Sequence, residues 1–295
     1  MKEYLTALLS KQQYTEQDSR VLIDTLDAIT DSHLSRQWDD LMRFYDEHAD
    51  FSIPDGLDAI RKARAIADEL EIRRYTVELL LFLCMSKTLK RRYVERGLSD
   101  EMFDGVLDDM RYKVTECKLL HGIVGSFVAD WFIGFFTLNR FSFGRLQFEL
   151  MNLKQDYVLD GLSLAHDESV INVHIPRTGT PLSPQECEAA YAKGAAFFKE
   201  ALDGKIVFHC SSWLLYPEHE KFLPSHSNVL TFARRYTLIE HGEYGDDFAS
   251  LWRIFDTQYD GNPDNLPNNS SLRRAYIQRL KEGKNIGWGT GVFRY

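Results

Sequence analysis

The chain has 295 residues, of which 44% are hydrophobic and 27% are charged, and its formal net charge is −9. A chain of this length is expected to form about two domains, and the composition is that of a globular protein with a full hydrophobic core. The negative charge argues against broad electrostatic attraction to nucleic acid or to an anionic membrane.

The cysteines are scattered through apolar stretches, at Cys84, Cys117, Cys187 and Cys210. None has the paired spacing of a zinc site, so we expect reduced, buried thiols, no structural disulfide and no metal site. The first residues carry neither a long apolar core nor a small-residue cleavage site. We therefore expect no signal peptide and a cytoplasmic protein.

Residues 1–120 are predicted to be helical almost throughout. Apolar residues recur at helical spacing over Val77–Thr88 and Phe103–Cys117. Ser99, which two acidic residues follow, is a typical helix start. The next run, Gly122–Leu138, is apolar, but it is short for a membrane span and is interrupted by an acidic residue. It is therefore predicted to be a buried core helix, without membrane insertion.

The second half of the chain changes to short β-rich segments that alternate with helices. Val170–Ile175 is an apolar, β-branched strand, and Ser183-Pro184 begins a helix with a capping serine and a proline at the first helical position. Asp203-Gly204 ends that helix before a second buried strand, which predicts a βαβ unit with two parallel strands. The second strand of this unit is Lys205–Cys210. The other predicted strands lie within Phe141–Leu150 and at Thr237–Glu243, Leu251–Asp256 and Gly287–Phe293, and the other predicted helices at Ser227–Tyr236 and Ser270–Glu282.

Ligands of a parallel βαβ unit bind beyond the carboxyl ends of the strands, and these ends are His174–Arg177 and Cys210–Trp213. Arg177 supplies a fixed positive charge suited to phosphate, and the capped helix behind the loop can receive an anion. Together they favour a diphosphate-binding loop. The alternative is an ordinary strand-to-helix connection with an exposed arginine.

His174 and His209 are the candidate general bases, because an unperturbed histidine titrates near neutral pH. The alternative for His174 is a core histidine whose hydrogen bonds the fold satisfies. A second interpretation makes Cys210 or Ser211 a nucleophile with one of these histidines as its base, but no nucleophile elbow surrounds them. The glycine spacing of Gly287–Gly291 is weak evidence for a phosphate site, and we expect a tight turn before a final strand.

Three stretches resemble known acyltransferases: VINVHIPRTGTPLSPQE, FHCSSWLLYPEHEKFLPSHSNVLTF and GWGTGVF. The order of predicted elements over Val170–Asp256 is similar to that of the GNAT acyltransferase fold. Nearly the whole chain resembles a group of bacterial acyltransferase-domain proteins that join a helical N-terminal domain to a GNAT-like C-terminal domain. The resemblance implies an α+β or α/β protein, with an all-helical domain at residues 1–120 and a GNAT-like mixed-sheet acyltransferase domain at residues 121–295.

The resemblance also implies that the co-substrate is acetyl-CoA or another acyl-CoA. Its diphosphate would lie on the loop formed by Arg177, Thr178, Gly179 and Thr180, and its arm would lie near Asn228. The loop departs from the usual glycine-rich pattern, because Gly179 is its one glycine. The two threonine hydroxyls would therefore have to donate where other GNAT proteins use backbone N–H groups.

In many GNAT enzymes a tyrosine of the late helix protonates the leaving thiolate. Phe232 occupies that place here, and Tyr236 is the nearby candidate. The expected function is N-acyl transfer from an acyl-CoA to a small-molecule or peptide amine by direct attack, with His174 or a carboxylate taking the amine proton. The alternative is a catalytically inactive, GNAT-shaped protein that binds a ligand or a partner, which the altered loop and Phe232 favour. A homo-oligomer is compatible with either function.

Overall fold

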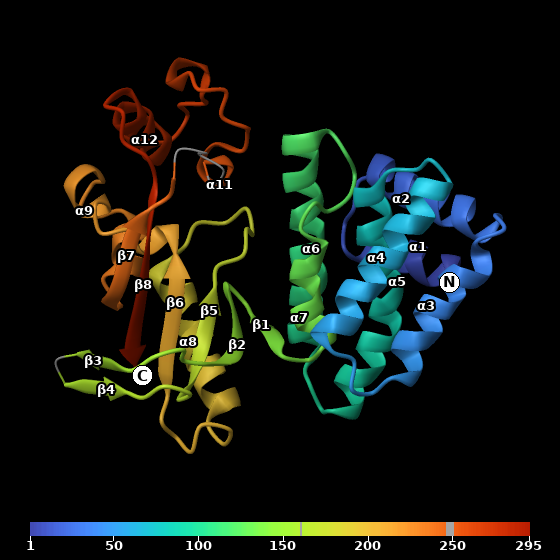
Figure 1. Cartoon of the computed structure of the whole chain (residues 1–295), viewed down its shortest axis with the longest axis horizontal. Coiled ribbons are helices and arrows are strands. Elements are labelled where there is room, and N and C mark those ends of the chain that lie inside the picture. The colour runs from blue at the N-terminus through green and yellow to red at the C-terminus, as the bar shows by residue number, and fades with distance from the viewer. Residues whose placement is uncertain (160, 246–250) are drawn as a thin grey trace. The chain divides into compact units, whose positions relative to one another are not determined.

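A computed structural model describes residues 1–159, 161–245 and 251–295 of the protein (Figure 1). The chain divides into a helical unit, Met1–Ser142 with Arg177–Gly179, and a sheet unit, Phe143–Pro176 with Thr180–Tyr295. The predicted fold class, a helical N-terminal region followed by a mixed sheet, is confirmed. The division into domains at residues 1–120 and 121–295 stays a prediction.

The helical unit is a bundle in which α5 packs against α1, α2, α3, α4 and α6 (Figure 1). Its elements are α1 (Lys2–Lys11), α2 (Glu16–Thr30), α3 (Ser35–Glu47), α4 (Ile53–Glu69), α5 (Arg74–Glu95), α6 (Asp100–His121), the 3-10 helix η1 (Ala129–Phe132) and α7 (Ile133–Phe136). Thr76–Ser86 of α5 is buried at every position, so the helix has no solvent-exposed face there. Within this stretch the Glu78 carboxylate accepts from Arg64 at 2.6 Å and 3.1 Å, which compensates its buried charge.

The helix predicted to start at Ser99 is confirmed as α6, because the Ser99 hydroxyl accepts from the Met102 N–H at 3.3 Å. The single buried core helix predicted for Gly122–Leu138 is wrong. Gly122 adopts a left-handed φ of +67°, which ends α6, and the chain continues through the short η1 and α7.

The main sheet has six strands in the order β1-β2-β5-β6-β8-β7, and β3 and β4 form a separate hairpin. The strands are β1 (Arg140–Phe143), β2 (Leu146–Asn152), β3 (Tyr157–Leu159), β4 (Leu162–Leu164), β5 (Ser169–His174), β6 (Val207–Ser212), β7 (Thr237–Glu243) and β8 (Gly287–Arg294). The accompanying helices are α8 (Pro184–Phe198), η2 (Trp213–Leu215), α9 (His219–Phe222), α10 (Asn228–Ala233), α11 (Trp252–Phe255), η3 (Pro263–Asn265) and α12 (Ser271–Lys281). β5 and β6 are parallel and joined by α8, so the predicted βαβ unit is confirmed.

The two faces of the sheet differ because side chains alternate along each strand. On one face, α8 places Tyr191 against Phe148, Phe208 and Phe293, with ring centroids 4.9–6.0 Å apart. Gly194 permits this packing, since an added Cβ would lie 2.5 Å from the Phe148 ring. On the other face, the β3–β4 hairpin packs over the apolar starts of β5 and β6 and the end of β8. The hairpin was not predicted from the sequence, because strands of three residues leave no clear periodicity.

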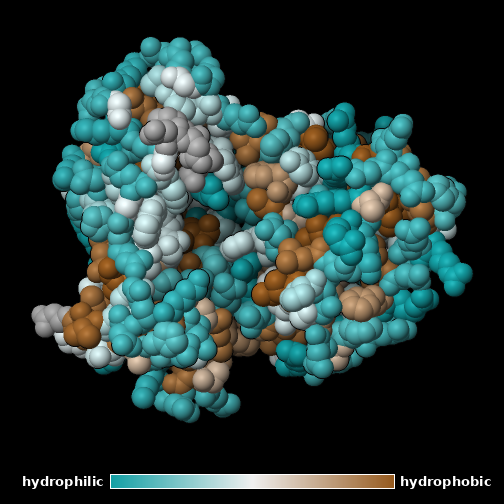
Figure 2. Space-filling view, in the orientation of Figure 1, coloured by the Kyte–Doolittle hydropathy of each residue, from teal (hydrophilic) through white to brown (hydrophobic). Residues whose placement is uncertain are grey.

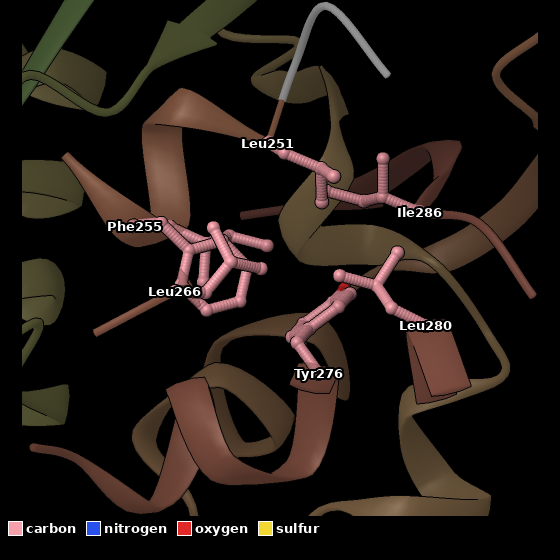
Figure 3. Close-up of a cluster of buried hydrophobic side chains, with 7 residues drawn as sticks. Leu251, Phe255, Leu266, Tyr276, Leu280 and Ile286 are labelled. Carbon is pink, nitrogen blue, oxygen red and sulfur yellow. The ribbon is translucent and has the colours of Figure 1, made fainter. Parts of the chain in front are cut away.

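A second core lies in the C-terminal part of the sheet unit (Figure 3). It contains the buried residues Leu251, Ile254, Phe255, Leu266, Tyr276, Leu280 and Ile286. The predicted strand at Leu251–Asp256 is wrong, because the segment forms α11. Leu251, Ile254 and Phe255 lie on one side of a helix but would be divided between the two faces of a strand. Burial in this core therefore favours the helix.

Glycines of β8 provide room for η2 and the residue that follows it. A Cβ added at Gly289 would lie 2.3 Å from the carbonyl oxygen of Leu215. A Cβ added at Gly287 would lie 2.1 Å from the ring of Tyr216. The whole stretch Gly287–Arg294 is an extended strand, so the tight turn expected there is wrong. These glycines are explained by close packing of a distant segment.

We expect Gly289→Ala to lower the free energy of unfolding by about 1–3 kcal/mol, because the backbone carbonyl of Leu215 would have to move away from the new methyl group. Urea unfolding of both proteins measures the change. Gly245→Ala is the matched control, because nothing lies within 4 Å of a Cβ at that position. Equal stability of Gly289→Ala and the wild type would contradict the close approach.

Hydrophilic residues cover most of the face shown in Figure 2, with apolar residues between them. The large exposed apolar side chains of the helical unit include Ile53, Leu57, Val94 and Leu119. An exposed apolar residue of this kind is normal on a protein surface. Across the described ranges, no helix is both long enough and apolar enough to cross a bilayer.

Candidate functional site

Four polar side chains, Glu149, Asn172, His174 and His209, form a row across the face of the sheet opposite α8. Glu149 of β2 lies opposite Asn172 of β5, which in turn lies opposite His209 of β6. His174 follows Asn172 by two residues, so it projects from the same face of β5. Strand register therefore brings the two predicted histidines together, with a carboxylate and an amide beside them. We call these four residues the polar row.

Hydrogen bonds connect the polar row. Nε2 of His174 lies 2.7 Å from Oε1 of Glu149, and Nδ2 of Asn172 lies 3.2 Å from the same oxygen. Nδ1 of His209 lies 3.0 Å from Oδ1 of Asn172. The His174 and Glu149 side chains are 19% and 18% exposed, whereas His209 is 8% exposed. The row therefore runs from the partly exposed, hydrogen-bonded His174–Glu149 pair to a buried histidine.

One assignment of protons satisfies all these contacts. An ionised Glu149 only accepts, so Nε2 of His174 and the amide nitrogen of Asn172 both donate to it. Oδ1 of Asn172 then faces His209 and must accept from Nδ1–H. The 3.2 Å separation between Asn172 Nδ2 and His174 Nε2 follows from their sharing one oxygen. In the neutral state, His174 therefore carries its lone pair on Nδ1 and His209 carries it on Nε2.

The two histidines are not equivalent as bases. Burial lowers the pKa of His209 from 6.5 to about 4, and the nearby charge of His174 lowers it further as a smaller cause. His209 is therefore neutral at pH 7 and accepts a proton poorly. His174 has the Glu149 carboxylate beside its Nε2, which stabilises an imidazolium formed there. The geometry favours His174 as the group that receives a proton.

β5 and β6 pair through only two positions, Ile171 with Phe208 and Asn172 with His209. Beyond them β5 continues to His174 and β6 to Ser212, so the two strands separate at the polar row. A ligand that enters at the carboxyl ends of these strands would meet His174 first.

Gln147, opposite His174 on β2, adds a further polar group. It is 1% exposed, and among the described residues neither its amide nitrogen nor its amide oxygen has a hydrogen-bond partner. A buried, unsatisfied amide is uncommon and is typical of functional positions or of bound water. Sequence periodicity gave no reason to select Gln147.

The predicted diphosphate loop follows β5. Arg145 donates to the Pro176 carbonyl at 2.8 Å, which fixes the chain where it leaves the strand. Arg177 and Thr178 are half-buried, whereas Gly179 and Thr180 are exposed, and Gly179 has a left-handed φ of +70°. Glycine adopts that conformation without the steric cost that a side chain brings, so a glycine suits this turn.

The first turn of α8 begins as predicted. The Ser183 hydroxyl accepts from the Glu186 N–H at 3.2 Å and donates to the Glu186 carboxylate at 2.8 Å. Pro184 has no N–H, so Gln185 supplies the remaining amide of this first turn. The helix start therefore offers an anion fewer backbone donors than an uncapped helix would.

Tyr236, the candidate acid, lies on the α8 face of the sheet. Its hydroxyl is 2.7 Å from that of Tyr191, and it also interacts with Cys210. Burial raises the pKa of Tyr236 well above its usual value of 10.0. Cys210 and His209 are consecutive in β6 and project from opposite faces, so the sheet separates Tyr236 from the polar row.

The remaining predicted residues are located as follows. Asn228 is exposed at the first position of α10, which Ser227 caps by accepting from the Val229 N–H at 3.2 Å. Cys210 is buried, and burial raises the pKa of its thiol to about 12, so it is a weak nucleophile at neutral pH. All four cysteines are buried, as the sequence predicted.

A hollow of about 330 Å³ lies in the helical unit between α3 and α4. Its three carboxylates already have partners: Asp40 with Arg43, Asp58 with Arg61 and Asp55 with Ser52. Carboxylates that already have local partners point to no ligand, so we assign this hollow no functional role.

Sequence reasoning identified both histidines of the polar row but not Glu149 or Asn172. Asn172 lies two residues before His174 and shares its strand face, which was the available signal. Glu149 is separated from His174 by 25 positions in the sequence. Only the register between β2 and β5 shows that the two side chains meet.

Two family models together match nearly the whole chain. The GNAT-like C-terminal domain matches residues 140–293, and the N-acyltransferase N-terminal domain matches residues 3–138. None of the curated proteins matches the chain.

Solved structures with a similar fold include acyltransferases. One, in complex with decanoyl-CoA and teicoplanin, is 24% identical with a TM-score of 0.74, over 98% of this chain and 86% of that chain. A mutant acyltransferase in complex with octanoyl-CoA is 23% identical with a TM-score of 0.74, over 99% of this chain and 88% of that chain. A third, in complex with CoA and 10C-teicoplanin, is 23% identical with a TM-score of 0.72, over 98% of this chain and 86% of that chain. At these identities the likeness shows the fold.

The resemblance noted in the sequence is confirmed by the match of the family models to both halves of the chain. The order of the sheet, the parallel β5–α8–β6 unit and the match over residues 140–293 agree with one another. The chain belongs to the family of proteins with a GNAT-like C-terminal domain, preceded here by an N-acyltransferase N-terminal domain.

Proposed function

We propose that the protein transfers an acyl group from an acyl-CoA thioester to an amine of a small molecule or peptide. The observation that carries the proposal is the His174–Glu149 pair, 2.7 Å apart, at the point where β5 and β6 stop pairing. A general base is thereby located where folds of this kind bind ligands. Acyltransferases of similar fold were crystallised with decanoyl-CoA, octanoyl-CoA and CoA, which supports an acyl-CoA as co-substrate.

In the proposed step, the amine nitrogen attacks the thioester carbonyl carbon and forms the new C–N bond. The C–S bond then breaks, and CoA leaves as a thiolate. Nδ1 of His174 accepts the proton that the amine loses, while Nε2–H remains hydrogen bonded to Glu149. Because an ordinary thiol has a pKa of about 8.5, the thiolate is a tolerable leaving group without a strong acid beside it.

We propose that Arg177, Thr178, Gly179 and Thr180 hold the CoA diphosphate and that Asn228 contacts the CoA arm. The charge and planar fork of Arg177 support this assignment, because they match phosphate oxygens. Few backbone donors are available in the first turn of α8, so more of the binding energy has to come from side chains of the loop. Tyr236 as the acid has less support, since burial disfavours its ionised form.

Binding of CoA is tested by thermal unfolding. Decanoyl-CoA at a hundredfold excess over its Kd should stabilise the folded protein by about 2.7 kcal/mol. This corresponds to a rise in Tm of roughly 5–10 °C for a chain of this size. Arg177→Ala should reduce the rise, because a charge-assisted contact worth about 1.5–3 kcal/mol is lost. Arg294→Ala, at an exposed position of β8, is the matched control.

Transfer itself is followed by release of the CoA thiol from decanoyl-CoA, with teicoplanin and simple alkyl amines as acceptor probes. Teicoplanin is chosen because an acyltransferase of similar fold was crystallised with it. No shift in Tm with any CoA species at millimolar concentration would exclude an acyl-CoA co-substrate. Binding of CoA without release of thiol for any amine would instead support the catalytically inactive binding protein.

A further inference from the structure

We propose that His209 is a positioning residue, which acts through Asn172 and Glu149 to hold His174 in its base-competent form. The inference rests on the proposed function, since it assigns a role within the same site. It concerns the residue of the polar row that is most buried and lies at the end farthest from His174. The sequence made both histidines candidate bases. In this proposal His174 is the base, and His209 only orients the residues beside it.

The amide of Asn172 can adopt two orientations. Its oxygen and nitrogen are nearly equal in size, so packing alone does not select the orientation that directs the nitrogen to Glu149. The reversed amide would direct its oxygen at the carboxylate, which is repulsive. Nδ1–H of His209, 3.0 Å from Oδ1, makes the observed orientation the favourable one. Glu149 and His209 therefore favour the same orientation of the amide, and removal of the His209 donor takes away one of the two groups that hold it.

The Asn172 amide in turn contacts Glu149. Its Oε1 accepts from both Asn172 and His174, at 3.2 Å and 2.7 Å. The amide thereby holds the carboxylate oxygen beside His174 on β5, although Glu149 itself belongs to β2. With Oε1 held in place, Nε2 of His174 keeps its proton, and the lone pair remains on Nδ1. His209 thus donates to Asn172, and Asn172 donates to Oε1 of Glu149. The same Oε1 accepts the hydrogen bond from Nε2 of His174.

Burial at His209 is consistent with this role. Its neutral ring donates through Nδ1–H at neutral pH, and the face it occupies continues into the apolar cluster that includes Val170, Val207 and Val292. A residue that only donates a hydrogen bond does not need to reach the substrate. A base has to reach the substrate. Substitutions that keep the hydrogen-bond donor but remove the basic nitrogen therefore distinguish the two roles.

The kinetic test compares three substitutions of His209 in the full chain. His209→Asn places an amide nitrogen near the former Nδ1 and can still donate to Asn172, whereas His209→Gln mimics Nε2 and His209→Leu donates nothing. We expect His209→Asn to stay within about threefold of the wild-type kcat, and the other two to lose about tenfold with KM nearly unchanged. If all three substitutions instead lower kcat by about 10²–10⁴-fold, His209 is the base and the proposal is overturned.

A second measurement does not depend on catalysis. In protein labelled with ¹⁵N-histidine, NMR should show the Nδ1–H tautomer for His209 and the Nε2–H tautomer for neutral His174. Asn172→Leu should abolish the Nδ1–H preference of His209. An Nε2–H tautomer of His209 in the wild type would overturn the proposal. If the tautomers are as expected but no amine is acylated, the relay stands and the proposed transfer function fails.

Discussion

Replacement of His174 is expected to lower the rate of acyl transfer by about 10²–10⁴-fold, the usual contribution of a general base. Two variants separate the base from its hydrogen bond. His174→Asn removes both the base and the donor to Glu149. His174→Gln keeps an amide nitrogen near the former Nε2, so the contact with Glu149 is retained while the basic nitrogen is lost. Both should be nearly inactive if His174 accepts the amine proton.

The stability of these variants decides between the base and a core histidine that only supports the fold. His174→Gln should keep its Tm near that of the wild type, because Glu149 still has a donor. His174→Asn leaves a partly buried carboxylate with one partner fewer, so a modest loss of stability is expected. An active His174→Gln protein would remove His174 from the mechanism. A protein that is inactive only because it is unfolded would show a large fall in Tm.

The second large effect concerns stability at acidic pH. His209 and His219 are 8% and 0% exposed, and the pKa of each is lowered from 6.5 to about 4. Burial is the main cause in both, with the charge of His174 adding to it at His209 and that of Arg279 at His219. In the unfolded chain both histidines titrate near their ordinary pKa. Between these two pKa values the unfolded state therefore binds protons that the native state does not.

The free energy of unfolding should consequently rise with pH through this window and be largely recovered above the unfolded pKa. Each histidine should account for a loss of about 2 kcal/mol between pH 7 and pH 5. Urea unfolding at pH 7, 6 and 5 measures the slope. His219→Gln removes one titrating group but leaves a polar atom facing the hydroxyl of Tyr276, its hydrogen-bond partner. This variant should show a shallower dependence on pH.

The control for this substitution is His226→Gln, at an exposed position of the same unit. It introduces the same side chain without altering the C-terminal core. If His219→Gln and the wild type lose the same free energy of unfolding between pH 7 and pH 5, His219 does not remain neutral in the folded protein. His174→Gln thus tests the base by activity, and His219→Gln independently tests a buried neutral histidine by stability.

The sequence by itself determined the elements whose signals are local. The β5–α8–β6 unit was predictable because β-branched residues, the Ser183-Pro184 cap and the Asp203-Gly204 stop all lie within the segments that they specify. The helical N-terminal region was predictable for the same reason, since helical periodicity needs only neighbours along the chain. The family followed from these stretches as well, and the matches over residues 3–138 and 140–293 confirm it.

The tertiary structure decided what depends on contacts between distant segments. The run Leu251–Asp256 is short enough to be strand or helix, and burial beside Tyr276 selected the helix. The need for glycine at position 289 is explained only by the Leu215 carbonyl, which packs against it in the folded protein. Glu149 meets His174 because β2 and β5 pair in one register, and a shift by one residue would direct the carboxylate to the opposite face. Periodicity within a strand specifies its faces but not its register against a neighbour, so the polar row could not be assembled from the sequence.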